Sequence, residues 1–351
     1  MTRHNIVAII LLLALCACAP RDRYISFSGY AQGGTYTVKL NLNGRNGMIK
    51  TKPEAIRDSV DAILWKIDNT LSGYNSNSTL SRFNAGEQVV ADDMFVDIYE
   101  KSYGFYVETQ GALDVASAPL FDIWGFGFKN GQMPSDAQVK SVMQNSGMKR
   151  LHGDMRSCAG DGGLLYPADL LQKESEVNPS LNYNAVAQGY SCDVVAEYLY
   201  SLGVKDMMVD IGEIFCDGKN PSGKSWTIGI DRPRDGNDQV GADIHGIFKI
   251  PEGPCGVVTS GNYRKFYVKD GKKYAHTIDP RSGYPVTHNL LSATIVAPDA
   301  TMADAYATYC MVIGLEAAKE FLLSRNDIEG CLIYDDNGAF STWTSPGLIL
   351  E

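Results

Sequence analysis

The chain has 351 residues, with 44% hydrophobic residues, 35 glycines and a formal net charge of −10 at pH 7. Such a chain can bury a sizeable core while making many turns, and its acidic balance argues against nucleic acid as a partner. No repeat, low-complexity tract or break in composition divides it. We therefore expect one folded domain over 29–351, with two interlocked lobes as the alternative.

The N-terminus has the features of an export signal. A short positive start precedes an apolar run from Ile6 to Leu15, which is too short to cross a membrane comfortably. The residues LCAC that follow resemble a bacterial lipobox, which implies lipidation of Cys18 and a lipid anchor on a bacterial membrane, facing the periplasm. A plain secretory signal cut near the same position is the alternative. We expect a signal peptide over 1–17 and a lipidated tether over 18–28.

Hydrophobic spacing and turn residues predict a mixture of helices and strands along the rest of the chain. A helix opening at Pro53 carries a core-facing stripe at Ile56, Val60, Ile63, Ile67 and Leu71. Further helices are predicted over 93–110, 135–146, from after 184 to about 203, and 300–323. Strands are predicted over 36–42, 207–211, 226–230, 256–260, 265–269, 293–297 and 330–334.

A hairpin centred on Asp270 and Gly271 indicates antiparallel pairing. Strands grouped late in the chain, with helices between the clusters, favour an α+β fold with largely antiparallel sheets and flanking helices. Residues 152–171 are interpreted as an inserted, glycine-containing loop with no assigned role.

Six cysteines remain beyond the signal and the lipobox, and none forms a CxxC pair or a zinc or iron–sulfur spacing. Their disulfide pairing stays open, because connectivity does not follow from sequence. Cys192 and Cys310 lie in helical patterns and are expected to be buried thiols. The six are Cys158, Cys192, Cys216, Cys255, Cys310 and Cys331.

Oxygen ligands for a metal are suggested near the end of the chain. Asp304 and Thr308 lie four residues apart, so one helix face presents a carboxylate and a hydroxyl together. Such ligands suit Mg²⁺, with Mn²⁺ as the alternative, and water and phosphate oxygens would fill the remaining positions. An ordinary polar helix stripe is the other interpretation.

A proton-transfer group is suggested where a predicted strand runs into a turn. His276, Asp279 and Arg281 fall within six residues and are followed by turn-forming residues. Histidine is the side chain best suited to moving protons near neutral pH, and Asp279 is a possible orienting partner. The alternative is a polar residue that merely ends a strand.

Taken in order, eight segments of the chain resemble the ApbE family of flavin transferases, which move FMN from FAD onto a threonine or serine of a partner protein. The resemblance covers nearly the whole mature chain. The segments are GGTYTV (33–38), LSGYNSNSTLSRFN (71–84), TQGALDVASAPLFDIWGFG (109–127), LNYNAVAQGYSCDVVAEYL (181–199), VDIGEIFCDG (209–218), TSGNYRKFY (259–267), HTIDPRSGYPV (276–286) and ADAYAT (303–308).

The resemblance implies a role for particular residues. It assigns Mg²⁺ to Asp304, Thr308 and the backbone carbonyl of Ala187, and makes His276 the group that activates the acceptor hydroxyl. Glycines allow close backbone approach, Tyr74 offers a stacking face and Asp114 accepts hydrogen bonds, although turn, core and capping roles are the alternatives. The implied flavin and nucleotide contacts are Gly33, Gly34, Thr35, Gly73, Tyr74, Ala112, Leu113, Asp114, Gln188, Tyr190, Ser260 and Ile278.

Two positions depart from the family pattern. Gln188 stands where relatives usually carry a lysine, and Glu213 follows Gly212 where many carry a second glycine. Because glutamine hydrogen-bonds without neutralising charge, we expect Mg²⁺ to carry more of the electrostatic load here.

The resemblance implies Mg²⁺-dependent transfer of FMN from FAD to a Thr or Ser hydroxyl through a phosphoester bond, with release of AMP. The partner is then an acceptor flavoprotein with a threonine-containing motif, typically a membrane electron-transfer subunit. Hydrolysis of FAD to FMN and AMP is one alternative, and a non-catalytic FAD-binding lipoprotein is the other.

Overall fold

The computed structural model describes residues 23–127, 133–234, 236–237, 241–251, 253–262, 266–269 and 272–351. The signal peptide, Cys18 and the first part of the tether lie outside these residues, as do the turn residues Asp270 and Gly271. Within the described ranges, none of the helices has the length and apolarity that crossing a membrane requires.

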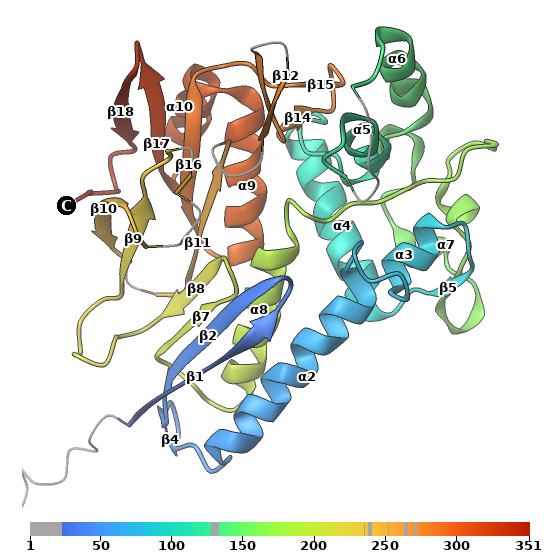
Figure 1. Ribbon diagram of the computed structural model, residues 1–351. Coiled ribbons are helices and arrows are strands. Elements are labelled where there is room, and N and C mark those ends of the chain that lie inside the picture. The colour runs from blue at the N-terminus through green and yellow to red at the C-terminus, as the bar shows by residue number, and fades with distance from the viewer. Residues whose placement is uncertain are drawn as a thin grey trace, which may run out of the picture.

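One eight-stranded sheet forms the centre of the fold (Figure 1), and every neighbouring pair of its strands is antiparallel. Its order is β1 (Tyr24–Ala31), β2 (Gly34–Asn41), β7 (Met207–Asp210), β8 (Ile214–Asp217), β11 (Cys255–Gly261), β16 (Leu290–Ala297), β17 (Glu329–Asp336) and β18 (Ala339–Thr344). This confirms the predicted α+β class.

Five two-stranded pairs surround the main sheet, and each is antiparallel, including the predicted hairpin β12–β13. They are β3 (Asn43–Gly44) with β4 (Gly47–Met48), β5 (Val89–Val90) with β6 (Leu164–Leu165), β9 (Thr227–Asp231) with β10 (Ile244–Lys249), β12 (Phe266–Lys269) with β13 (Lys272–Ala275), and β14 (Ile278–Asp279) with β15 (Tyr284–Pro285).

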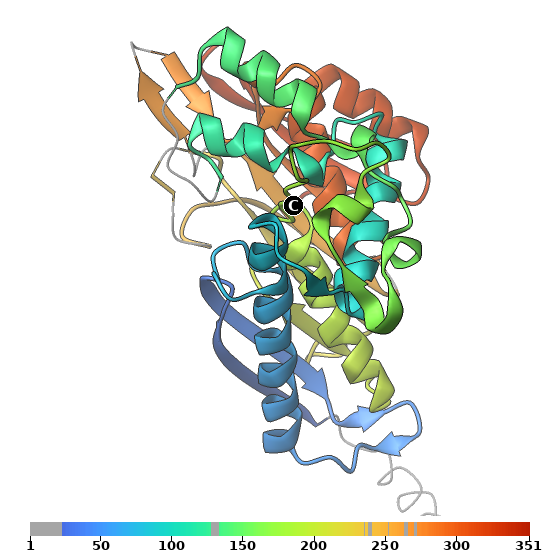
Figure 2. The ribbon, with the colours of Figure 1, turned by 90° about the vertical axis from the view of Figure 1, so that its right-hand side faces the viewer.

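Helices α8 and α9 pack on one face of the sheet and against each other, and the long helix α2 and α4 lie outside them (Figures 1 and 2). The main core lies between these layers. The α-helices are α2 (Pro53–Leu71), α3 (Thr79–Asn84), α4 (Asp93–Glu108), α5 (Ala118–Trp124), α6 (Asp136–Asn145), α7 (Met155–Cys158), α8 (Ala187–Ser201), α9 (Ala300–Ile313) and α10 (Leu315–Ser324).

The predicted stripe of α2 is confirmed except at one position. Ile56, Val60, Ile67 and Leu71 are buried, but Leu64 takes the place expected for Ile63, which is half-buried. Spacing of four, three and four residues from Val60 follows the helical repeat more closely.

The single helix expected over 300–323 is wrong, because the chain breaks at Gly314 into α9 and α10. Gly314 has φ +81, a conformation that favours glycine, and the His288 ring lies 2.8 Å from where a Cβ would be. The break separates α10 from the helix that carries Asp304 and Thr308.

The tether expected over 18–28 is also too long at its described end. Residues from Tyr24 onward belong to β1, which pairs along its whole length with β2.

The segment 152–171 is more than a loop, since it forms α7 and β6 and buries Met155, Leu165 and Leu170. The six cysteines of the described chain are free thiols, and Cys192 and Cys310 are buried as expected.

Candidate active site

The carboxylate of Asp304 meets the first turn of α8. Asp304 is buried on α9, and its Oδ2 accepts a hydrogen bond of 3.1 Å from the backbone N–H of Gly189. A Cβ at Gly189 would lie 2.2 Å from the carbonyl oxygen of Ala300, so only glycine allows the helices to approach this closely. Ala187, two residues earlier, is thereby brought beside Asp304.

A second carboxylate, Asp193, fastens α8 to the start of α9. Its oxygens accept hydrogen bonds from the N–H of Ala300 (2.9 Å) and from the N–H (2.8 Å) and hydroxyl (2.5 Å) of Thr301. Asp299 separately caps α9 by accepting from the N–H of Met302 at 2.7 Å. The sequence interpretation missed Asp193; its spacing of four residues from Gly189, on one helix face, was the available signal.

The buried carboxylate of Asp304 and the half-buried carboxylate of Asp193 are both shifted toward the protonated form when no cation is present. Burial, together with the nearby charge of Asp193, raises the pKa of Asp304 to about 7, although the hydrogen bond from Gly189 lowers it. Burial likewise raises the pKa of Asp193 to about 6. In the described part of the chain, no Lys or Arg nitrogen lies within 4 Å of the Asp304 carboxylate. A bound cation would offset the free-energy cost of burying the ionised Asp304 carboxylate away from water.

The other predicted metal ligands lie at the same place. Thr308 is one turn beyond Asp304, and its hydroxyl lies 3.3 Å from that of Ser260 on β11. The carbonyl of Ala187 accepts a hydrogen bond of 2.6 Å from the Ser191 hydroxyl. A carboxylate, hydroxyls and a carbonyl are a donor set that fits a hard cation such as Mg²⁺. Among the described residues, no group of three or more His, Cys, Asp or Glu side chains could hold a metal ion.

The hairpin between β1 and β2 reaches the same helix terminus. The Gln32 side-chain amide donates to the Ser191 hydroxyl at 2.5 Å, and that hydroxyl in turn bonds Ala187. The exposed residues Gly33, Gly34 and Thr35 follow directly. The predicted GGT segment therefore lies beside the start of α8, with its backbone open to a ligand.

Tyr74 also borders this region. Its side chain is 69% exposed at the end of α2, after the half-buried Gly73, and its hydroxyl accepts a hydrogen bond of 3.2 Å from the side-chain amide of Asn184. Asn184 precedes α8 by three residues. The tyrosine is thus held at its hydroxyl, and most of its side chain is exposed.

Other predicted flavin contacts serve the core. Asp114 accepts hydrogen bonds from the N–H groups of Ala116 (2.9 Å) and Met148 (3.0 Å), which is the capping role held as the alternative. Burial raises the pKa of Asp114 to about 6. The side chains of Ala112, Leu113, Tyr190 and Ile278 are buried.

Gln188, at the position where the family pattern has lysine, is turned toward the β7–β8 connection. Its side-chain amide donates a hydrogen bond of 3.2 Å to the carbonyl of Ile211. The side chain thus has a structural contact in addition to any contact with a ligand.

His276 lies two residues before β14, and Asp279 is the second residue of that strand. The carboxylate of Asp279 is hydrogen-bonded to Arg281. Its two carboxylate oxygens each accept a hydrogen bond of 2.9 Å from the Arg281 guanidinium. The ring of His276 packs edge-on against Phe126, with 6.5 Å between centroids. The structure therefore ties Asp279 to Arg281, and an orienting role toward His276 stays a prediction.

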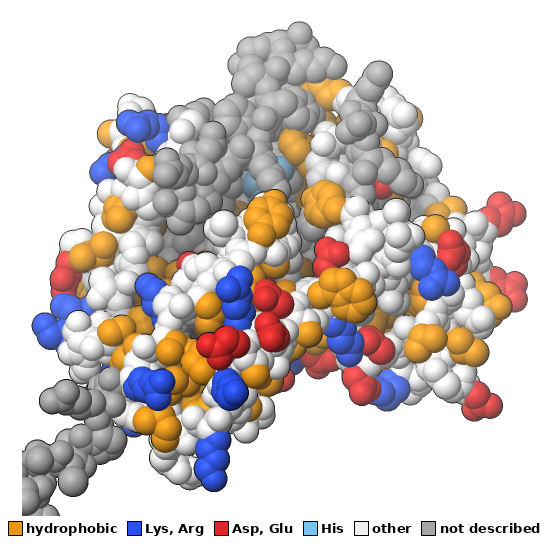
Figure 3. Space-filling model, turned by 60° about the horizontal axis from the view of Figure 1, so that its bottom comes forward, with side chains coloured by type: hydrophobic (Ala, Val, Ile, Leu, Met, Phe, Trp, Pro, Cys, Tyr) orange, Lys and Arg blue, Asp and Glu red, His pale blue; other side chains and the backbone are white. Residues whose placement is uncertain are grey.

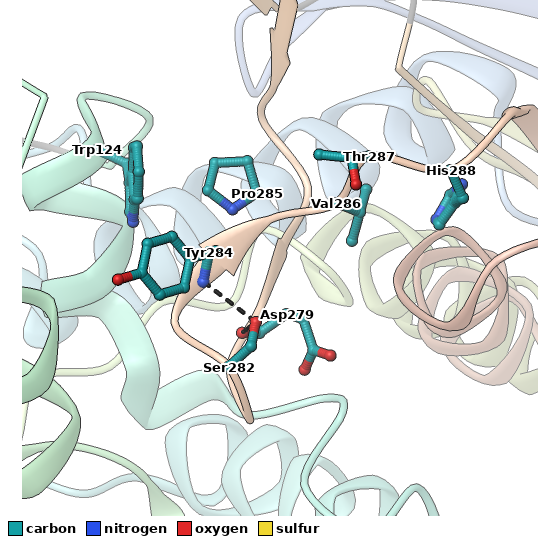
Figure 4. A pocket seen from close by; sticks show the side chains of 8 residues that line it. All are labelled: Trp124, Asp279, Ser282, Tyr284, Pro285, Val286, Thr287 and His288. Atoms are coloured by element: carbon teal, nitrogen blue, oxygen red, sulfur yellow. Dashed lines mark hydrogen bonds between the residues drawn. The ribbon is translucent and has the colours of Figure 1, made fainter. Parts of the chain in front are cut away.

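A cavity of about 410 Å³ opens beside this turn (Figure 4). Trp124 and Tyr284 form an aromatic wall with ring centroids 5.8 Å apart, and Trp124 donates a hydrogen bond of 2.8 Å to the carbonyl of Gly283. The sequence interpretation missed both aromatic residues. The lining residues are Trp124, Asp279, Ser282, Tyr284, Pro285, Val286, Thr287 and His288.

The cavity lies near the predicted metal ligands Asp304, Thr308 and Ala187, which we call the cation-ligand group, but does not include it. Asp304, Thr308 and Ala187 do not line it, whereas β14, which carries Asp279, contacts α9. The buried carboxylate of Asp304 and the paired hydroxyls of Ser260 and Thr308 therefore lie outside the cavity lining. The cavity is of a size that holds part of a large ligand.

Comparison with known proteins gives a consistent result. The ApbE family model matches residues 33–332. The FAD:protein FMN transferase of Haemophilus influenzae is 32% identical, over 95% of this chain and 93% of its own length, and that of Escherichia coli K12 is 32% identical over 86% and 82%. The solved structure of the Pseudomonas stutzeri flavinyl transferase ApbE has a TM-score of 0.75 at 30% identity, covering 93% of this chain and 95% of its own. The Vibrio cholerae flavin transferase ApbE has 0.73 at 27%, covering 93% and 98%.

Proposed function

This chain belongs to the ApbE family, and from that premise we propose that it is an enzyme that transfers the flavin part of FAD to a protein. The names of its relatives support this function. The observation in this chain that carries it is a buried Asp304 that is held to the start of α8, one helical turn before the Ser260–Thr308 hydroxyl pair.

In the proposed reaction, a Thr or Ser hydroxyl of the acceptor attacks the FMN phosphorus of FAD. A new P–O bond forms, the P–O bond to the AMP part breaks, and AMP leaves with the electron pair. The hydroxyl proton passes to the imidazole of His276, which is at a strand end and partly exposed. Catalysis rests mainly on positioning and on neutralising charge.

The residues proposed to hold Mg²⁺, or Mn²⁺, are Asp304, Thr308 and the carbonyl of Ala187. When bound, such a cation supplies positive charge against the phosphate oxygens. The protein's own part is to keep these ligands together through the Gly189 contact and the Asp193 hydrogen bonds. Gly33–Thr35 and the face of Tyr74 are proposed to receive the nucleotide and the ring.

We further propose lipidation at Cys18 and an acceptor that is a flavoprotein with a threonine-containing motif, of the kind found in membrane electron-transfer complexes. The lipobox-like residues 15–18 support the first proposal. Mass spectrometry of the mature protein from membranes tests it, since an unmodified N-terminus would contradict the assignment.

The transfer is tested with the mature chain, FAD, Mg²⁺ and a threonine-containing acceptor domain. We expect AMP release matched by in-gel flavin fluorescence on the acceptor, and a His276→Ala variant that loses on the order of 10²-fold in rate while still binding FAD. AMP and free FMN without label would identify a hydrolase. Bound FAD without AMP would identify a storage protein and contradict the catalytic assignment.

A further inference from the structure

One end of the molecule differs in charge from the rest. Residues 23–53 contain five Lys or Arg and no Asp or Glu, although the whole chain has 41 acidic and 31 basic residues. The fold brings this segment together with the end of α8, because the N–H of Arg45 donates a hydrogen bond of 2.8 Å to the carbonyl of Gly203. The hydroxyl of Tyr24 donates to the carbonyl of Lys219 at 2.5 Å.

We call the exposed residues at this end the basic face. The nearby acids Asp206 and Asp217 are buried and take part in hydrogen bonds or ion pairs inside it. Among the described residues, the first exposed acids along the chain are Glu54 and Asp58, at the start of α2. Figure 3 shows Lys and Arg gathered around apolar side chains near the grey N-terminal trace. The basic face consists of Arg23, Arg45, Met48, Lys50, Lys52, Lys205 and Lys219.

We propose that the basic face is the surface by which this protein lies against an anionic lipid bilayer. The inference rests on charge complementarity and on where the anchor segment meets the fold. Arg23 is itself part of the face, and the five residues from Cys18 span at most about 17 Å when fully extended. With a lipid on Cys18, the face is confined near the headgroups, and its lysines lack ion pairs within the described residues.

The orientation has a consequence for the acceptor, which rests on the proposed function. Helix α8 ends at the basic face and begins at Ala187, and its 15 residues span about 22 Å. The cation-ligand group therefore lies up to about 20 Å from the bilayer. We therefore expect the acceptor hydroxyl on an extramembrane segment that lies within about 20 Å of the bilayer.

The test uses the mature chain with Cys18→Ser, so that no lipid contributes to binding. Co-sedimentation at low ionic strength compares phosphatidylglycerol-containing vesicles with pure phosphatidylcholine vesicles. Each lysine near an anionic surface contributes roughly a fivefold factor, so a triple variant at Lys50, Lys52 and Lys205, each changed to Gln, should bind about 100-fold more weakly. The matched control changes the exposed Lys101, Lys140 and Lys173 to Gln.

We expect wild-type binding from the control triple and loss of binding at high salt. The proposal is overturned if the wild-type chain binds neither vesicle, binds both equally, or is weakened equally by the two triples. Thermal melts verify folding of both variants. Since sedimentation needs no FAD, its outcome is separate from that of the transfer assay, and AMP release with a soluble acceptor should be unchanged in either triple.

Discussion

Changing Asp193 to asparagine would test whether the α8–α9 connection holds the cation ligands in place. Asp193 accepts hydrogen bonds from two backbone N–H groups and one hydroxyl at the start of α9. Asparagine keeps a single oxygen and turns an NH₂ group toward one of these donors. Hydrogen bonds to a charged group contribute about 1.5–3 kcal/mol each, but relief of a buried charge offsets part of the loss. We expect a net destabilisation of about 2 kcal/mol.

The effect on cation binding should be larger than this loss of stability suggests. Groups that orient metal ligands typically change metal affinity by about 10- to 100-fold when they are removed. Binding of Mn²⁺ followed by electron paramagnetic resonance measures the affinity without turnover. The Mg²⁺ dependence of AMP release should shift in parallel, and raised Mg²⁺ should restore the rate of Asp193→Asn.

Asp299→Ala is the matched control, because Asp299 caps the same helix without connecting it to α8. It should cost about 1 kcal/mol of stability and leave Mn²⁺ affinity unchanged. An unchanged affinity in Asp193→Asn, or an equal loss in both variants, would refute the reasoning.

Three further predictions concern packing, the flavin and pH. Gly189→Ala forces a clash with α9 and should cost about 1–3 kcal/mol in chemical denaturation, whereas Gly104→Ala, with open space around it, should not destabilise. Tyr74→Ala should weaken FAD binding in calorimetry by about 1–3 kcal/mol, whereas Trp65→Ala, with an equally exposed ring, should not. Because the raised pKa of Asp304 means that the folded state holds its proton more tightly, the cation-free protein should lose stability as pH rises from about 4 to about 7; Asp304→Asn should flatten that slope in thermal melts.

Structural features that depend on the spacing of neighbouring residues were predictable from the sequence, whereas features that depend on contacts between distant residues were not. The α2 stripe and the Ser135 cap of α6 follow from neighbouring residues. In contrast, β1 is an edge strand that pairs with β2, and its residues are half-buried or exposed. Its sequence therefore shows little of the apolar pattern by which a strand is predicted. Gly314 ends α9 partly because His288, 26 positions earlier, fills the space beside it.

The same distinction holds at the site. Helical spacing predicted that Asp304 and Thr308 share one face of a helix, and the structure places Ser260, which the family resemblance implies as a nucleotide contact, beside Thr308. Asp193 bonds residues 107 and 108 positions away; its spacing from Gly189 places it on the same face of α8, but local spacing does not reveal these distant partners. Asp114, which the family resemblance implies as a flavin contact, also caps its own turn by accepting a hydrogen bond from the N–H of Ala116, and its contact with the flavin stays a prediction.

The charge balance around Asp304 bears on how this chain handles phosphate. None of the described residues gathered there, from Ala187 to Gly189 and at Asp193, Ser260 and Thr308, is Lys or Arg, and the guanidinium of Arg281 is paired with Asp279. Among these described residues, the buried Asp304 and the half-buried Asp193 have no Lys or Arg nitrogen within 4 Å, so under the proposed function a bound cation would be the main local source of positive charge. Gln188→Lys should therefore lower the Mg²⁺ concentration needed for half-maximal AMP release. An unchanged requirement would mean that position 188 does not face the phosphates, as its hydrogen bond to Ile211 allows.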